Sequence, residues 1–292
     1  MRHLSLNGGR ASINLELKMA DRIQTEETIA QYSRRAPGSF QFIRYQVEGP
    51  VARLTLQHGE HNLLNEPMLR ELAAGIGGLA ENSAVKMIIL DAAGKVFCAG
   101  VDIGEYIGAR AFSMLDAFHS ACLAMVEAPQ PVLVIVDGVA VGGGAELVAY
   151  GDLVVATPRA RFALPEITIG MFPPLASTML PYIVGPKRAL ELVLTGEAIS
   201  AERARDLGLV NRLVPEAQLQ AAVNELVAKI TAQSGAVLGM AKKAVVGGMG
   251  MSLRDSLKNS MNIFLNELYR LEDSQEGLRA LLEKRKPQWK NR

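Results

Sequence analysis

Two glutamates are the side chains of this chain best placed to do chemistry. Glu146 follows the glycines 142–144 at the start of an expected helix, and Glu166 follows the next strand-like run and its loop. Glycines let backbone N–H groups approach a ligand closely, and a helix N-terminus adds positive potential there. Two carboxylates that share one water can serve as base and acid, because repulsion raises one pKa and leaves the other low. The pattern predicts an acid/base pair beside an oxyanion hole.

The elements that must position these residues are short strands separated by helices. A hairpin is expected within 40–56, around the turn Glu48-Gly49-Pro50. Strands are expected at 86–91, 131–136 and 153–156, and helices at 68–79, 111–127 and from 146 onward. Strands that alternate with helices imply βαβ units and a mainly parallel sheet. From residue 176 the chain is expected to be almost all helix, at 187–194, 200–208, 216–232, 236–246, 252–271 and 274–285.

Three segments follow from this pattern. Residues 1–39 form an N-terminal extension. It has only a weak helical pattern, which ends at Pro37-Gly38-Ser39, so the extension is expected to be either a surface arm or disordered. Residues 40–210 form the catalytic α/β core, and 211–292 form a C-terminal helical region. Met19 is an alternative start.

Composition excludes several classes of protein. A net charge of +1 offers no electrostatic case for nucleic-acid binding, and no run approaches the roughly 20 apolar residues that span a bilayer. The two cysteines, Cys98 and Cys122, cannot form a disulfide framework, and acids among the first residues argue against a transit peptide, so we expect a cytoplasmic protein. There is no metal-ligand spacing, phosphate loop or dinucleotide fingerprint, so neither a metal nor a cofactor is expected.

From about Phe42 to Trp289 the chain resembles the enoyl-CoA hydratase, or crotonase, superfamily. The resemblance is carried, in order, by Phe97-Cys-Ala-Gly-Val-Asp-Ile103, Val139-Ala-Val-Gly-Gly-Gly-Ala-Glu146, Ala163-Leu-Pro-Glu-Ile-Thr-Ile-Gly170, Leu194-Thr-Gly-Glu197, Ala204-Arg-Asp-Leu-Gly-Leu-Val-Asn211 and Glu283-Lys-Arg-Lys286. It implies an α/β fold whose core is a ββα spiral, followed by C-terminal helices that build a homotrimer or a hexamer formed by two trimers.

The resemblance also implies roles. Glu146 and Glu166 match the two catalytic glutamates of the hydratases, and the N–H groups of Val101 and Gly143 match the oxyanion hole for a thioester carbonyl. Glu166 would protonate the α-carbon, and Glu146 would activate water with it. The acyl-CoA substrate would be bound by Cys98, Ala99, Asp102, Ile103, Gly142, Phe172, Pro174 and Lys284, the last reaching a neighbouring subunit.

Retention of both glutamates favours an enzyme that adds water to an unsaturated acyl-CoA. Isomerases of the family usually keep one glutamate, and thioester hydrolases and decarboxylases often differ at one or both. A non-catalytic, RNA-binding member would need lost glutamates or a basic face. A lone glutamate at a helix start would ordinarily only interact with the helix dipole. Asp102 is expected to have such a structural role, because it can cap the next helix together with Glu105. A lone histidine such as His119 is expected to pack rather than to act as a base.

Two departures from the usual hydratase pattern affect the substrate. Gly104 stands where many hydratases carry a CoA-binding lysine. Pro174 stands in a segment that is usually Pro-Gly-x-Gly-Gly, and proline has no N–H to hold water or substrate near Glu166. Phe172 and Leu175 are expected to make the acyl pocket more apolar. The motifs at 97–102, 118–119 and 171–174 are also similar to those of cyclohexa-1,5-diene-1-carbonyl-CoA hydratases, so a cyclic dienoyl-CoA and a short linear 2-enoyl-CoA both stay open as substrates.

Overall fold

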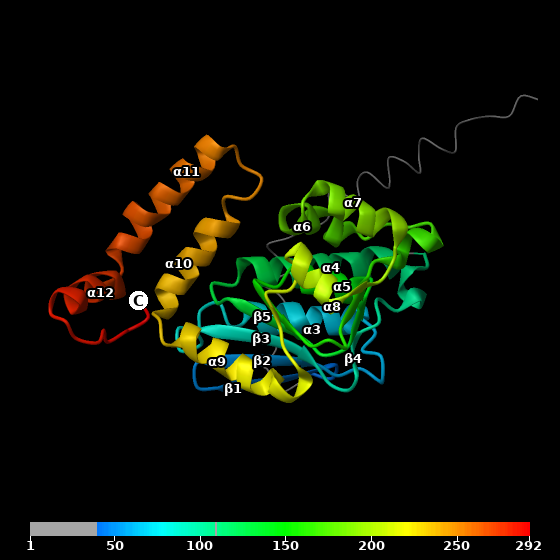
Figure 1. The fold of residues 1–292 in the computed structure, drawn as a ribbon, viewed down its shortest axis with the longest axis horizontal. Coiled ribbons are helices and arrows are strands. Elements are labelled where there is room, and N and C mark those ends of the chain that lie inside the picture. The colour runs from blue at the N-terminus through cyan, green and yellow to red at the C-terminus, as the bar shows by residue number, and fades with distance from the viewer. Residues whose placement is uncertain (1–39, 109) are drawn as a thin grey trace, which may run out of the picture.

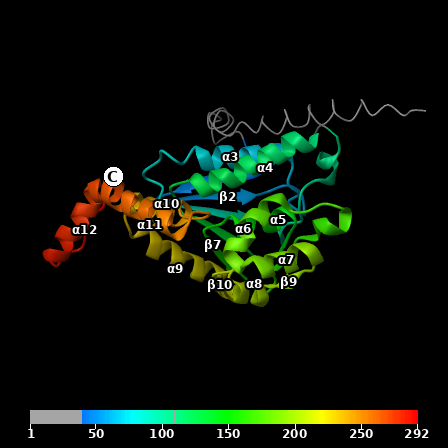
Figure 2. The same ribbon diagram turned by 90° about the horizontal axis from the view of Figure 1, so that it is seen from above.

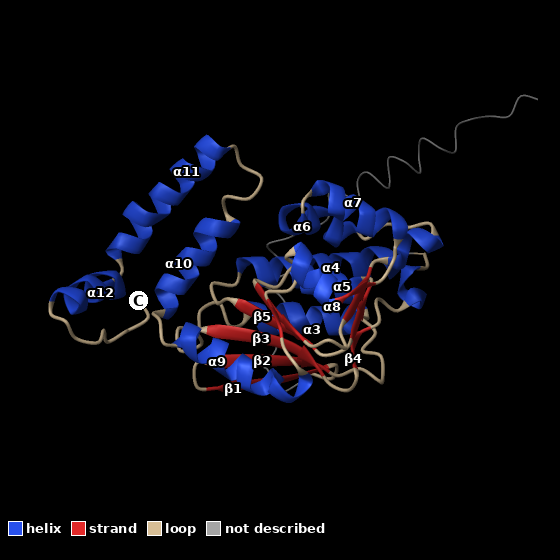
Figure 3. Ribbon diagram, viewed as in Figure 1, coloured by secondary structure: helices blue, strands red, loops and turns tan. Residues whose placement is uncertain are grey.

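The core consists of two β-sheets wrapped by helices (Figures 1 and 3). The computed structural model describes residues 40–108 and 110–292, so the extension predicted for 1–39 lies outside the described residues. The larger sheet has the order β1-β2-β3-β5-β7-β10, and the smaller has the order β4-β6-β8-β9. The strands are β1 (Ile43–Glu48), β2 (Val51–Leu56), β3 (Met87–Ala92), β4 (Val96–Cys98), β5 (Val132–Val136), β6 (Val139–Val141), β7 (Leu153–Ala156), β8 (Arg161–Ala163), β9 (Ile199–Ser200) and β10 (Arg212–Leu213).

Successive strands alternate between the two sheets, which makes the core a spiral. β3, β5 and β7 pair in parallel in the larger sheet, and each is followed by β4, β6 or β8 in the smaller one. A helix then leads to the next turn of the spiral. These helices are α4 (Arg110–Glu127), α5 (Gly143–Ala149) and α6 (Pro174–Val184). The predicted ββα spiral is confirmed.

The hairpin expected at Glu48-Gly49-Pro50 is also confirmed. Glu48 pairs with Val51 across an antiparallel ladder, and Gly49 adopts φ +55°, a left-handed conformation that glycine reaches without strain. This hairpin adds an antiparallel edge to a sheet whose other strands are parallel.

The central strands are apolar throughout because both faces of the larger sheet are covered. Along β3, Ile88 and Leu90 join the main core, which α3 (Glu66–Gly77) and α4 close. Met87 and Ile89 face the other way and pack in a second cluster with Val223 of α9 (Leu219–Thr231). The remaining helices of the core are α7 (Pro186–Thr195) and α8 (Ala201–Leu207).

The C-terminal helices project from one side of the core (Figures 1 and 2). They are α10 (Gly235–Val246), α11 (Leu253–Asn262) and α12 (Glu272–Leu282). The helix expected over 252–271 is interrupted, because α11 passes into a π-helical turn at Ile263–Glu267 and a 3₁₀ turn at Leu268–Arg270. Large apolar side chains remain exposed along this region, among them Leu253, Leu257, Met261, Phe264, Leu265, Leu281 and Leu282.

A half-buried ion pair anchors α10 to the core. The Lys242 ammonium lies 2.7 Å from a carboxylate oxygen of Asp152 and donates to the carbonyl of Met125. Asp152 in turn accepts from the N–H of Val132 at the start of β5. The projecting helices are therefore held at a fixed point on the sheet. No helix in the described part of the chain is long and apolar enough to cross a membrane.

Candidate active site

The glycine loop between β6 and α5 brings two distant segments together. A Cβ atom at Gly142 would lie 2.8 Å from Oε1 of Glu166, and Gly142 has φ +52°. A Cβ atom at Gly143 would lie 2.9 Å from Cγ2 of Val101. Real Cβ atoms are not found so close to other atoms, so a side chain at 142 would displace the Glu166 carboxyl group and one at 143 would displace the Val101 side chain. The absence of side chains at 142 and 143 therefore lets Glu166 and Val101 approach the loop.

Two backbone N–H groups at this junction have no acceptor among the described residues. Leu64 donates to the Gly100 carbonyl over 2.9 Å, and Asp102 donates to the Leu64 carbonyl over 2.8 Å, which leaves the N–H of Val101 between them unused. Gly143 is the first residue of α5, where an N–H has no partner within the helix. Both residues line one cavity. The two donors have the arrangement expected of the oxyanion hole that the resemblance implies, and that role stays a prediction.

Glu146 is buried in α5, with 1% of its surface exposed. Its Oε1 accepts from the N–H groups of Leu175 (2.9 Å) and Ala176 (2.8 Å) at the start of α6. Burial raises the pKa of Glu146 to about 7, with a further contribution from the charge of Glu166, although the two hydrogen bonds oppose the rise. A carboxyl group with such a pKa can exchange a proton near neutral pH.

Glu166 lies on the short 3₁₀ helix η3 (Pro165–Ile169) and lines the same cavity. Its Oε2 is buried and has no hydrogen-bond partner among the described residues. Burial raises the pKa of Glu166 above its ordinary value. The site therefore holds two carboxyl groups whose proton affinity is increased by their surroundings, as acid/base work requires.

The cavity beside these groups has a volume of about 190 Å³. It is lined by Ala99, Gly100, Val101, Ile103, Tyr106, Val141, Gly142, Gly143, Pro165, Glu166, Thr168, Ile169 and Met171. Among the residues predicted for the site, the structure brings Ala99, Val101, Ile103, Gly142, Gly143 and Glu166 together here.

The other predicted residues, the buried Glu146 among them, lie outside this lining. Cys98 is buried, a Cβ at Gly144 would lie 2.5 Å from its carbonyl oxygen, and burial raises the pKa of its thiol to about 12, so it packs as an inert side chain. Phe172 is 62% exposed, and its neighbour Met171 lines the cavity. Pro174 begins α6, directly before the two N–H groups that bind Glu146. Lys284 follows α12 in the C-terminal helical region and is not among the residues that line the cavity.

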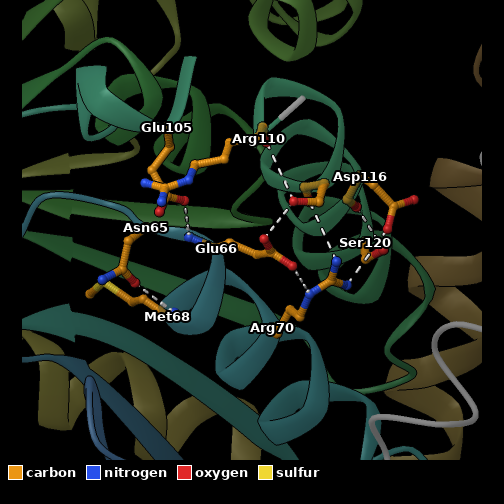
Figure 4. Close-up of polar contacts among 9 residues, drawn as sticks. Asn65, Glu66, Met68, Arg70, Glu105, Arg110, Asp116 and Ser120 are labelled. Carbon is orange, nitrogen blue, oxygen red and sulfur yellow. Dashed lines mark hydrogen bonds and ion pairs between the residues drawn. The ribbon is translucent and has the colours of Figure 1, made fainter. Parts of the chain in front are cut away.

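Asp102 caps the short 3₁₀ helix η2 (Ile103–Tyr106) by accepting from the N–H of Gly104 over 2.9 Å. The expected capping partner is wrong, because the Glu105 carboxylate accepts from the N–H of Glu66 over 2.7 Å at the start of α3 (Figure 4). Glu105 therefore ties η2 to a helix that is remote in sequence.

A polar cluster extends this tie to α4 (Figure 4). The Glu66 carboxylate accepts from Arg70 over 2.7 Å and from the hydroxyl of Ser113 over 2.5 Å. Arg70 also lies 3.6 Å from a carboxylate oxygen of Asp116. These contacts fix α3, α4 and η2 relative to one another, and with them the wall of the cavity that η2 provides.

Sequence reasoning did not name the other seven residues of the lining, which are Gly100, Tyr106, Val141, Pro165, Thr168, Ile169 and Met171. Tyr106 is the one of them that can titrate. Burial, followed by the charges of Glu146 and Glu166, raises its pKa to about 12, so it is a neutral phenol. A signal was present, because side chains three residues apart on a 3₁₀ helix share a face, and Tyr106 lies three residues after Ile103.

Nothing in the described part of the chain resembles a metal centre. No group of three or more His, Cys, Asp or Glu side chains there could hold a metal ion. His119 is half-buried on α4, and the carbonyl of His61 accepts from the N–H of Ala99 over 3.0 Å.

Comparison with known proteins agrees with this geometry. The model of the Enoyl-CoA hydratase/isomerase family matches residues 46–292. A cyclohexa-1,5-dienecarbonyl-CoA hydratase of Thauera aromatica is 32% identical over 247 residues, which cover 84% of this chain and 95% of the relative. A probable enoyl-CoA hydratase of Bacillus subtilis is 34% identical, with coverages of 85% and 98%. The solved enoyl-CoA hydratase of Mycobacterium smegmatis superposes with a TM-score of 0.80 at 33% identity, with coverages of 85% and 99%. This chain belongs to the enoyl-CoA hydratase/isomerase, or crotonase, family.

Proposed function

We propose that this protein is a hydro-lyase that adds water to the conjugated C=C bond of an unsaturated acyl-CoA thioester. The observation that carries the proposal is the pair of carboxyl groups of raised pKa, Glu146 and Glu166, beside the unused N–H groups of Val101 and Gly143. Family membership and relatives named as hydratases support it.

In the proposed mechanism the thioester oxygen accepts from Val101 and Gly143 N–H, and a water lies between the two glutamates. Glu146 and Glu166 together hold this water, and one of its protons passes to Glu166 as its oxygen bonds to the β-carbon. The C=C electron pair moves toward the thioester, and the enolate oxygen is stabilised by the two donors. Glu166 then protonates the α-carbon, which completes the addition of H and OH. Removal of one such donor typically lowers the rate by roughly 10²–10³.

The test is the loss of the ultraviolet absorbance of the conjugated thioester when the purified protein is added to crotonyl-CoA. Product analysis by mass spectrometry should show the gain of one water. A shift of the double bond without added water would favour an isomerase, and absence of any conversion of a panel of enoyl-CoA esters would refute the proposal. An RNA-binding role is disfavoured because both glutamates are present.

A cyclic dienoyl-CoA is the second candidate substrate. The Thauera aromatica relative is named for such a substrate, and the cavity wall beside Glu166 carries the apolar residues Ile103, Ile169 and Met171. In a conjugated ring diene, water could add to the end of the diene that is farther from the thioester. The enolate oxygen would again accept from the N–H groups of Val101 and Gly143. We expect a higher kcat/KM for cyclohexa-1,5-diene-1-carbonyl-CoA than for crotonyl-CoA. If crotonyl-CoA is preferred tenfold, about 1.4 kcal/mol of transition-state free energy, the protein is an ordinary short-chain hydratase.

The proposal includes a homotrimer or a hexamer. The apolar residues Leu257, Met261 and Leu265 are exposed on the projecting helical region, and patches of this kind mark interaction surfaces. In such an assembly Lys284 would reach the CoA of a neighbouring subunit. The mechanism needs no cofactor beyond the CoA of the substrate. A cytoplasmic location stays a prediction, to be tested by cell fractionation.

A further inference from the structure

A water held between two carboxyl groups still needs a hydrogen-bond donor. Water has two hydrogens and two lone pairs, and in the proposed reaction its hydrogens face Glu146 and Glu166. One lone pair forms the bond to the β-carbon. The second lone pair fixes the direction of attack only if a donor is aimed at it.

The start of α6 cannot supply this donor. Pro173 and Pro174 have no N–H. The next two N–H groups, those of Leu175 and Ala176, both donate to Oε1 of Glu146. The segment therefore serves to hold the Glu146 carboxyl group and has no further donor to offer a water.

Two side chains in the cavity lining carry a hydroxyl. The hydroxyl of Thr168 donates to the carbonyl of Pro165 over 2.7 Å, within its own 3₁₀ helix. The hydroxyl of Tyr106 makes no hydrogen bond within the described residues, although Tyr106 lines the same cavity as Glu166. The backbone at Tyr106 is fixed by its neighbour Glu105, whose carboxylate accepts from the N–H of Glu66. Its phenol is thus a pre-positioned donor without a partner.

We propose that the hydroxyl of Tyr106 donates a hydrogen bond to the oxygen atom that is added to the substrate, as the attacking water and then as the product hydroxyl. The proposal rests on the proposed hydratase function. No proton leaves Tyr106: one hydrogen of water passes to Glu166, the other stays on the product oxygen, and the phenol keeps its own. Tyr106 is thus a catalytic residue for the water step and is not needed for enolate formation.

Because Tyr106 is proposed to act in the water step and not in enolate formation, two reactions can test its role. Hydration of crotonyl-CoA needs the water, whereas exchange of the α-protons of butyryl-CoA in D₂O needs only the oxyanion hole and Glu166. Tyr106→Phe removes the hydroxyl and keeps the ring. We expect kcat for hydration to fall roughly tenfold to a hundredfold, the range for loss of one hydrogen bond to a charged group, because the attacking oxygen gains negative charge as its proton leaves. We expect KM and the rate of α-proton exchange to stay within about twofold on the same scale.

Tyr45→Phe is the matched control, because Tyr45 is a half-buried tyrosine on β1 at the far edge of the larger sheet. It should leave both rates unchanged, and thermal unfolding should show that both variants are folded. Hydration by Tyr106→Phe within twofold of wild type would overturn the inference. Equal loss of hydration and exchange would also overturn it, since Tyr106 would then support the site as a whole. Failure of the wild-type protein to hydrate any enoyl-CoA would instead refute the proposed function.

Discussion

Replacement of Glu146 by glutamine should make the protein more stable at alkaline pH and nearly inactive. Glutamine keeps the carbonyl oxygen that can accept from the N–H groups of Leu175 and Ala176, and it has nearly the same shape. It lacks the negative charge that burial disfavours. The same group that serves the reaction is therefore expected to destabilise the fold when ionised.

The magnitude follows from the pKa of Glu146. A rise from 4.5 to about 7 in the folded protein corresponds to about 3 kcal/mol, since a tenfold change in an equilibrium is about 1.4 kcal/mol. The folded state holds this proton more tightly than the unfolded state. Below pH 4.5 Glu146 is neutral in both states and carries no penalty; the penalty grows as the pH rises from 4.5 to 7 and is complete above 7. Glutamine has no such dependence.

The assay is urea unfolding of wild type and Glu146→Gln at pH 5 and pH 8.5, at one protomer concentration because an oligomer unfolds in a concentration-dependent way. The free energy of unfolding of the variant, measured relative to that of wild type, should rise by about 2–3 kcal/mol from pH 5 to pH 8.5. This is the upper value that the pKa difference between the folded and unfolded states allows. Other titrating groups, Glu166 included, are present in both proteins. An advantage that does not grow with pH would refute the reasoning. Turnover should fall by roughly 10²–10⁴.

The remaining predictions concern the other parts of the site and the assembly. Glu166→Gln should lower turnover by roughly 10²–10⁴ while calorimetric binding of a saturated acyl-CoA survives, and retention of about a tenth of wild-type turnover would exclude the two-carboxylate mechanism. Gly142→Ala should abolish hydration because its methyl would lie 2.8 Å from Oε1 of Glu166, whereas Gly59→Ala, at a similar positive φ with nothing within 4 Å, should remain active. Equal activities of these two variants would contradict that steric argument. Light scattering at micromolar concentration should show a trimer or hexamer that Leu257→Glu weakens, and a wild-type monomer would refute the assembly. Hydration should be unchanged after exhaustive chelation; activity that is lost with EDTA and restored by a metal would contradict a metal-free mechanism.

Much of the architecture could be predicted from local signals. The hairpin at Gly49, the apolar runs that became β3, β5 and β7, and the helix α4 were each expected within a few residues of their observed bounds. The strands of the smaller sheet were not predicted individually, because β4, β6 and β8 have only three residues each and are too short for a periodic pattern. Their pairing is set by contacts between turns of the spiral.

The sequence by itself determined which residues could be proposed as the acid/base pair and which glycine loop lies beside them. Glu146, Glu166 and the glycines could be named from residue type and order alone, because Glu146 follows three consecutive glycines at 142–144 and Glu166 lies in a second motif of the same family. Tertiary structure alone decided what surrounds them. In the folded protein Leu175 and Ala176 donate to Glu146, and Glu105 accepts from the N–H of Glu66. Tyr106 lines the cavity, whereas Phe172 does not. The physical reason is that burial, pKa and hydrogen-bond partners depend on segments about 30 to 40 residues apart, whose contact no local pattern encodes.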